Sequence, residues 1–242
     1  MKILLRCISI CWRTKKATTD GFHTMDDHHI TDIIRLLKRE LKSGELPIVS
    51  LLAEERRGPF PILISTLLSL RTKDEVTAKA SERLFALAAT PEEMLRLSEE
   101  EIQRAIYPVG FYRNKAKTIR AICRELIDRF ASRVPDTIEQ LLSLKGVGRK
   151  TANLVVSLGY GKDGVCVDIH VHRISNRLGY VVTKTPEETE YALRQKLPRR
   201  YWSVFNTLLV AFGRNICRPV SPLCSKCPVA EYCDRVGVAR SR

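Results

Sequence analysis

The sequence predicts an all-α fold, and three observations support this fold class. Helix-start signals recur along the middle of the chain, apolar residues between them are spaced three and four apart, and sustained two-residue alternation is absent. The spacing is clear in Ile119, Ile122, Leu126 and Phe130, which would share one face of a helix. We therefore expect a chain of roughly ten short helices.

The start signals are pairs in which Thr, Ser or Asp precedes Glu by three residues. In a capping box, the first side chain accepts a hydrogen bond from a free helix amide, and the glutamate side chain accepts a hydrogen bond from the amide of the cap residue. Apolar runs at 164–169 and 180–183 are expected to be connections, because two isolated strands form no stable sheet. The pairs are Thr72 and Glu75, Thr90 and Glu93, Ser98 and Glu101, Asp136 and Glu139, and Thr185 and Glu188.

Composition points to a globular protein with a polyanionic partner. The chain has 242 residues, of which 44% are hydrophobic and 28% are charged. Lys and Arg exceed Asp and Glu by 41 to 27, so the net charge is +14. Such a charge favours nucleic acid or an acidic membrane surface as partner. No run approaches the roughly 18 apolar residues of a membrane span, so we expect no membrane segment.

The N-terminal region resembles a secretory signal only superficially. Arg6 interrupts its apolar stretch, and no small-residue cleavage site follows. A basic leader without an acid before Asp20 is also compatible with a transit peptide. We expect residues 1–24 to be a disordered N-terminal extension of a protein that is not secreted.

The segment 217–233 holds four cysteines and three prolines in seventeen residues, too few for a hydrophobic core of its own. Disulfides are disfavoured, because nothing indicates export. Zinc sites of four cysteines usually pair two C-x2-C units, whereas an iron–sulfur cluster is larger and tolerates longer spacers. The spacing alone leaves zinc and a cluster open. The candidate metal ligands are Cys217, Cys224, Cys227 and Cys233.

The cysteine loop lies in a basic stretch of the sequence. From Tyr191 to Ala230 there are seven cations and no Asp or Glu, which predicts a positive face that binds phosphates in a salt-dependent way. A merely solvated basic surface is the alternative. The cations are Arg194, Lys196, Arg199, Arg200, Arg214, Arg218 and Lys226.

The stretch "LKGVGRKTAN" predicts a tight turn between two helices. Glycine allows positive φ and close approach of a ligand, and Val147 can anchor the turn in the core. The second helix would begin with free amides and a positive dipole end, so the turn is a candidate site for a nucleic-acid phosphate. The candidate residues are Gly146, Val147, Gly148 and Arg149.

Lys150 lies in the first turn of that second helix, where the dipole favours a neutral amine. A neutral amine can attack an electrophilic sugar carbon and form an imine, although a phosphate contact is an alternative role. Asp168 in "VDIHVHR" precedes another predicted helix. Its carboxylate can cap that helix and can also stabilise the positive charge of a breaking glycosidic bond. His170 is expected to have a structural role or to contact a phosphate.

These motifs, in this order and at these separations, resemble the endonuclease III family. Its members are bifunctional DNA glycosylases of the helix-hairpin-helix superfamily. The likeness runs from about Pro59 to Cys233 and is carried by the glycine turn, the "VDIHVHR" motif and the cysteine spacing. It implies an all-α fold of two lobes, a six-helix barrel and a lobe that carries a [4Fe-4S] cluster, with double-stranded DNA bound between them.

The resemblance also divides the chain. We expect residues 53–162 to form the barrel lobe, with the helix-hairpin-helix at 137–159. Residues 25–52 and 163–235 would form the cluster lobe, and 236–242 a flexible tail. The protein would be a monomer that acts on damaged bases in DNA, intracellular, and cytoplasmic with the nucleoid if its source is prokaryotic.

The family pattern implies residue roles and reveals two departures. It implies that Lys150 is the nucleophile and Asp168 its partner. Where the family commonly has a glutamine that fills the space of the extruded nucleotide, this chain has Arg71. The intercalating residue of the family's G-L-Y loop corresponds to Phe111, and a phenyl group can stack on bases. Arg113, Lys115 and Lys117 follow as expected contacts to the DNA backbone.

The resemblance implies excision of oxidised or saturated pyrimidines, followed by β-elimination at the abasic sugar in base excision repair. A monofunctional mismatch or adenine-type glycosylase is one alternative. A non-catalytic DNA-binding module is another, but such a module would need neither Lys150 nor Asp168.

Overall fold

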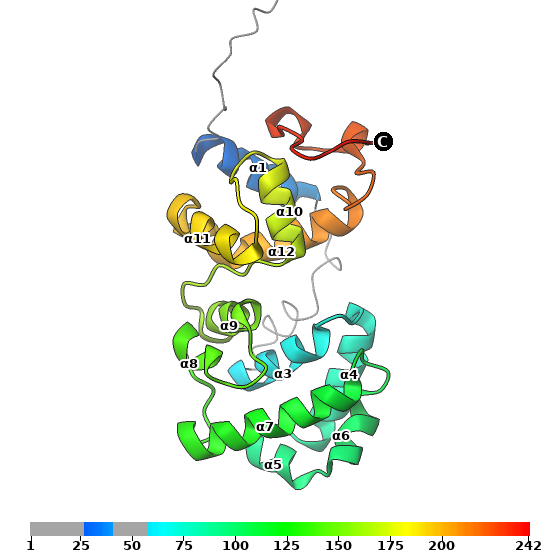
Figure 1. The fold of residues 1–242 in the computed structure, drawn as a ribbon, viewed down its shortest axis with the longest axis vertical. Helices are drawn as coiled ribbons and strands as arrows, with labels where there is room; N and C mark the ends of the chain where they lie inside the picture. The colour runs from blue at the N-terminus through cyan, green and yellow to red at the C-terminus, as the bar shows by residue number, and fades with distance from the viewer. Residues whose placement is uncertain (1–26, 41–57) are drawn as a thin grey trace, which may run out of the picture.

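The computed structural model describes residues 27–40 and 58–242. In these two ranges the chain forms helices and turns without any strand, so the all-α prediction is confirmed. Figure 1 shows two groups of helices stacked along the long axis of the molecule. The expected extension at 1–24 and the expected boundary between residues 52 and 53 lie outside the described residues.

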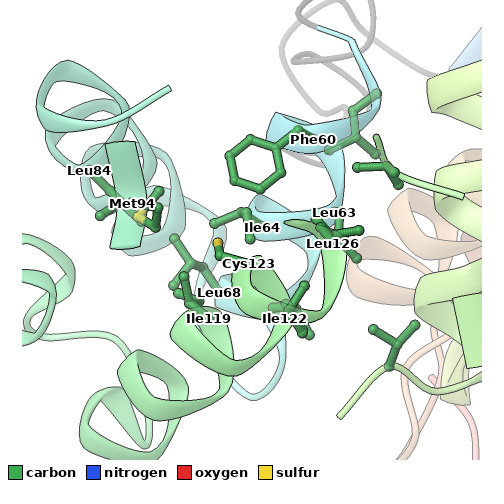
Figure 2. Close-up of a cluster of buried hydrophobic side chains, with 14 of the residues drawn as sticks. Phe60, Leu63, Ile64, Leu68, Leu84, Met94, Ile119, Ile122, Cys123 and Leu126 are labelled. Carbon is green, nitrogen blue, oxygen red and sulfur yellow. The ribbon is translucent and has the colours of Figure 1, made fainter. Parts of the chain in front are cut away.

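The first lobe contains α3 to α9, and α3 is its central helix. Eight of the eleven residues of α3 are buried, since the run from Phe60 to Leu68 is apolar apart from Ser65 and Thr66. Figure 2 shows Ile119, Ile122 and Leu126 of α7 facing this helix, as their spacing predicts. The elements are α3 (Pro59–Ser69), α4 (Asp74–Leu87), α5 (Pro91–Arg96), α6 (Glu99–Ile106), α7 (Tyr112–Phe130), α8 (Ile138–Leu142) and α9 (Arg149–Leu154), which continues into the π-helical segment η1 (Val155–Gly159).

The second lobe has a separate hydrophobic core, to which segments far apart in sequence contribute. Buried residues of α1, such as Ile30 and Ile33, pack with Phe205 and Leu209 of α12. The elements are α1 (Asp27–Glu40), α10 (Ile169–Arg177), α11 (Pro186–Lys196), η2 (Arg199–Tyr201), α12 (Trp202–Asn215), η3 (Cys224–Lys226) and η4 (Ala230–Tyr232). No helix of the described ranges is long and apolar enough to cross a membrane.

Two of the five predicted capping boxes form in full. Thr90 and Ser98 each accept the amide of the glutamate three residues on, and each glutamate accepts the cap amide in return. Thr185 also caps its helix, but Glu188 accepts the amide of Lys184 instead of that of the cap residue.

The other two pairs are not caps, so these two predictions are wrong. Thr137 rather than Asp136 caps α8, because Asp136 instead forms an ion pair with Lys162 at 2.6 Å. Lys73 precedes α4 without a side-chain cap, and the hydroxyl of Thr72 bonds elsewhere.

The C-terminal segment 236–242 was expected to be a flexible tail, but its backbone is bonded to the cysteine loop. The amide of Arg242 donates to the carbonyl of Pro222, and the carbonyl of Arg242 accepts the amide of Ser225, both at 2.9 Å. This pairing was not visible in the sequence, because backbone bonds between loops depend on no particular side chains.

A buried carboxylate joins the two lobes. Glu190 of α11 is 3% exposed and accepts hydrogen bonds from Arg149 of α9 at 2.7 and 2.9 Å and from Arg194 at 3.1 Å. Burial raises the pKa of Glu190, but the hydrogen bonds from Arg149, Asn153 and Arg194 outweigh it, so the pKa is lowered overall. Figure 1 shows α9 at the side of the first lobe that faces α11.

Glu190→Gln is predicted to destabilise the protein by about 3 kcal/mol, the lower end of the cost of breaking a buried ion pair, because Arg149 and Arg194 are only partly buried, at 28% and 25% exposed, and lose their anion. Since the folded pKa is lowered, the contribution of Glu190 is complete above the ordinary carboxyl pKa of 4.5 and is lost as the pH falls through the folded value. Urea unfolding at pH 7 and below pH 4 measures both effects. Glu187→Gln is the control, since Glu187 is 59% exposed and lies 3.8 Å from Arg149; an equal loss in both variants would contradict the prediction.

Candidate active site

A cleft of about 440 Å³ lies between the two lobes. Its walls come from the end of α3, the start of α4 and residues of α9 on one side, and from the start of α10 and from α12 on the other. The lining residues predicted from the sequence are Arg71, Lys150, Asp168 and His170. The structure therefore brings together residues that are up to about a hundred positions apart in the chain.

Lys150 and Asp168 face each other in this cleft. Lys150 is the second residue of α9, and its Nζ lies 3.5 Å from Oδ2 of Asp168. The lysine side chain is 37% exposed, whereas the aspartate side chain is 8% exposed. An amine that a ligand can reach is thus placed beside a carboxylate that is shielded from water.

Asp168 has a second role that fixes its position. It is the N-cap of α10, and its Oδ1 accepts the amides of His170 at 2.8 Å and Val171 at 2.9 Å. The capping role and the active-site role considered for this residue are compatible, because each uses a different carboxylate oxygen.

The glycine turn between α8 and α9 is shaped by one of its two glycines. Gly146 has φ +88, and a Cβ there would lie 2.7 Å from Cγ2 of Thr118. Gly148 has φ −98 and has open space at its Cβ position, so a ligand can approach its backbone. Val147 is buried in the first core, so its side chain anchors the turn and only its backbone can contact a ligand.

Arg149 is held within the protein. Besides its bonds to Glu190, its guanidinium lies 4.9 Å from the ring centre of Tyr191. The hydrogen bond to Glu190 raises the pKa of Arg149 above its ordinary value. The sequence predicts a phosphate contact here, but the structure shows that Arg149 also joins the two lobes.

His170 lies at the cleft, with its Nδ1 3.2 Å from Nη2 of Arg173. Burial lowers the pKa of His170. The negative charge of Asp168 raises this pKa, but the positive charges of Arg173 and Arg214 lower it, and the net shift is downward. The imidazole is therefore neutral at neutral pH and serves as a hydrogen-bonding group.

Arg71 and Phe111 form a contact although forty residues separate them. The guanidinium of Arg71 lies 5.6 Å from the ring centre of Phe111, and the phenyl ring is 60% exposed. Both residues have a left-handed backbone, with φ of 54° and 58°. Arg113 is exposed and lies over the ring of Tyr112 at 5.4 Å. Phe111 and Arg113 do not line the cleft.

The four cysteines of the 217–233 loop line one small recess of about 20 Å³ at the C-terminal end of α10. Arg177, the last residue of α10, donates to Sγ of Cys217 at 3.5 Å and to the carbonyls of Arg218 and Pro219 at 2.6 and 2.7 Å. Burial raises the pKa of Cys227 to about 11, and its cysteine neighbours add to this effect.

One ion pair of the site carried no signal in the sequence, although Arg214 itself belongs to the predicted basic stretch. Arg214 of α12 forms two hydrogen bonds to the carboxylate of Asp74 of α4, at 2.8 and 3.2 Å, and both residues line the cleft. Only the fold brings such distant charges together. Six of the seven cations of the acid-free stretch bind protein groups, so fewer are available to phosphates than the sequence suggests; they are Arg194, Lys196, Arg199, Arg200, Arg214 and Arg218.

The chain is similar to known DNA repair proteins in sequence and in structure. The profile of the HhH-GPD superfamily of base excision DNA repair proteins matches residues 64–199. Endonuclease III of Thermotoga maritima is 51% identical over 176 residues, which cover 73% of this chain and 83% of that protein. Endonuclease III-like protein 1 of Mus musculus is 46% identical, and the match covers 72% of this chain and 59% of the mouse protein.

A solved structure of a trapped covalent intermediate between endonuclease III and DNA is similar in fold, with a TM-score of 0.71 and 33% identity. The match covers 85% of this chain and 95% of that chain. From the extent of these matches and from the all-helical arrangement of two lobes, we conclude that the protein belongs to the endonuclease III family of DNA glycosylases with abasic-site lyase activity.

Proposed function

We propose that this protein excises oxidised pyrimidines from double-stranded DNA and then cleaves the abasic site by β-elimination. The observation that carries the proposal is the Lys150 amine, which lies 3.5 Å from the Asp168 carboxylate in a cleft between the lobes. The solved covalent intermediate between endonuclease III and DNA supports a covalent mechanism, for which the Lys150 amine is the candidate nucleophile here. A module that only binds DNA would need no such pair.

The reaction begins when the damaged nucleotide leaves the duplex and enters the cleft, which costs least for a base that stacks poorly. Nζ of Lys150 attacks C1′ of the sugar while the bond from C1′ to the base breaks, and the base leaves with a proton. The carboxylate of Asp168 stabilises the positive charge that develops on the sugar. It is also the nearest acceptor for a proton that the amine releases.

The new bond between nitrogen and C1′ becomes an imine when the sugar ring opens. Loss of a proton from C2′ then expels the 3′ phosphate, which cuts the strand. Atoms and charge balance without an oxidant or a reductant, because every step moves only electron pairs and protons.

DNA binding in this proposal uses the exposed backbone at Gly146 and Gly148 for phosphates. Arg71 and Phe111 would occupy the space of the extruded nucleotide, while Arg113 and His170 contact the strand beside it. The duplex would bind across both lobes of one chain, which is why we propose a monomer.

The cysteine loop would hold a [4Fe-4S] cluster. Two observations support this proposal: the four cysteines line one common recess, and the chain is similar to endonuclease III. The long, unequal spacers between the cysteines also suit a cluster of several irons better than the paired C-x2-C units of zinc sites. The cluster would cross-link the loop, and the guanidinium of Arg177 would offset the negative charge of the thiolates.

Borohydride reduction tests the imine. We expect the protein to form a covalent adduct with a duplex that contains an oxidised pyrimidine, and Lys150→Gln to form none, because an amide cannot condense with the sugar. Lys162→Gln removes a surface lysine that pairs with Asp136 and should leave the adduct unchanged. An adduct of undiminished yield with Lys150→Gln would rule out this mechanism.

Two substitutions separate the roles of Asp168. Asp168→Asn should slow excision by about 10² to 10⁴ with little loss of stability, because asparagine is also a good N-cap. Asp168→Ala should slow excision similarly and also destabilise the protein by about 1 kcal/mol. Single-turnover kinetics and thermal unfolding provide the two measurements. A normal excision rate in Asp168→Asn would show that the reaction does not need the carboxylate.

The purified protein is expected to be brown and to contain about four irons per chain. Cys227→Ser should lower the iron content, because it removes one of four ligands, whereas Cys123→Ala should not, because Cys123 is buried in the other core. Metal analysis and the visible spectrum measure the outcome. One zinc and no iron per chain would show that the cluster proposal is wrong.

A further inference from the structure

The segments that carry Arg71 and Phe111 are both strained. Each of these residues has a left-handed backbone, which is unfavourable for a residue other than glycine and persists only when its surroundings fix it. Arg71 lies in the link between α3 and α4, and Phe111 directly precedes α7. A group that ties these two segments together would hold both conformations.

Lys115 is such a group. Its half-buried ammonium donates to the carbonyls of Leu68 at 2.8 Å and Leu70 at 2.6 Å and to the hydroxyl of Thr72 at 3.2 Å. All three of its donors are therefore used on the last turn of α3 and on the link that carries Arg71. Burial lowers the pKa of Lys115 to about 8. The expected contact of Lys115 with the DNA backbone is thus wrong, because its charge faces the protein.

Lys115 lies in the first turn of α7, directly after the segment that carries Phe111. Its backbone amide donates to the carbonyl of Phe111 at 3.0 Å, which is the ordinary helical bond at this position, so the ammonium extends from the Phe111 segment to the Arg71 segment. The hydroxyl of Thr72 accepts the amide of Gly110 at 3.1 Å, and a Cβ on Gly110 would lie 2.7 Å from the carbonyl oxygen of Arg71. The two segments are therefore in close contact, with Lys115 and Thr72 between them.

We propose that Lys115, acting through Thr72, is a positioning residue that holds Arg71 and Phe111 as one preformed unit for insertion into DNA at the extruded nucleotide. The inference rests on the proposed function, since it assigns a task within base extrusion. Lys115 touches neither the sugar nor the base. A purely structural alternative exists, because the carbonyl of Leu68 belongs to the last turn of α3, where a lysine can serve as a cap.

The test compares extrusion with chemistry in the full-length protein. Lys115→Met and Thr72→Val remove the tether, Thr72→Ser keeps the hydroxyl, and Lys79→Met removes an exposed charge from α4 as a control. 2-Aminopurine placed opposite the lesion reports unstacking through its fluorescence. Single-turnover excision is measured on the same duplex, and borohydride trapping is measured on a single-stranded abasic oligonucleotide, which requires no extrusion.

We expect Lys115→Met and Thr72→Val to reduce the fluorescence change and to slow duplex excision by at least about tenfold, while trapping on the single strand changes by less than about twofold. Thr72→Ser should restore both duplex signals, and Lys79→Met should match the unchanged protein. Should Lys115→Met fail to fold, the two Thr72 variants decide.

Two results would overturn the inference. One is normal fluorescence and excision in a folded Lys115→Met or Thr72→Val protein. The other is a loss of single-strand trapping by the same factor as duplex excision, which would indicate a general structural role. Absence of trapping by the unchanged protein would instead reject the imine mechanism of the proposed function, so the two failures are distinguishable.

Discussion

The carboxylate of Asp168 is the group on which the geometry of the site depends. One oxygen holds the first turn of α10 and the other faces Lys150, so the cap that starts the helix also orients the carboxylate proposed to take part in the reaction. The far end of α10 is fixed by Arg177, which bonds to the cysteine loop. A single helix therefore connects the cleft to the proposed cluster, and disorder in the loop would be transmitted to Asp168.

Lys150 lies on α9 of the first lobe, whereas Asp168 begins α10 of the second lobe. The distance between them therefore depends on the relative position of the two lobes. Two groups of charges provide that restraint. Glu190 binds Arg149, the residue next to Lys150, and Arg214 binds Asp74 across the cleft. Buried and partly buried pairs of this kind favour one relative position of two surfaces, because any displacement leaves a charge without its partner. Part of the positive charge of the chain thus serves the protein itself.

Contacts between residues close in the sequence were predictable, whereas contacts between distant residues were not. The capping boxes at Thr90 and Ser98 and the apolar face of α7 were predictable, because their determinants lie within four residues of each other. The predictions at Thr72, Asp136 and Lys115 failed, since each side chain found a partner 26 or more residues away. A polar side chain takes its strongest available partner, and a short sequence window does not contain the distant ones.

The helical class, the glycine turn at Gly146, the resemblance to a family and the candidate residues for the chemistry were all predictable from the sequence, because they depend on residue type and short spacing. Three further facts depend on the folded arrangement: Lys150 and Asp168 lie 3.5 Å apart, Arg71 and Phe111 are in contact, and Arg149 is bound to Glu190. The contact of Arg71 with Phe111 requires the packing of the first lobe, and the other two require the two lobes to lie against each other. Their physical cause is the burial of apolar surface throughout the chain, to which no single motif corresponds.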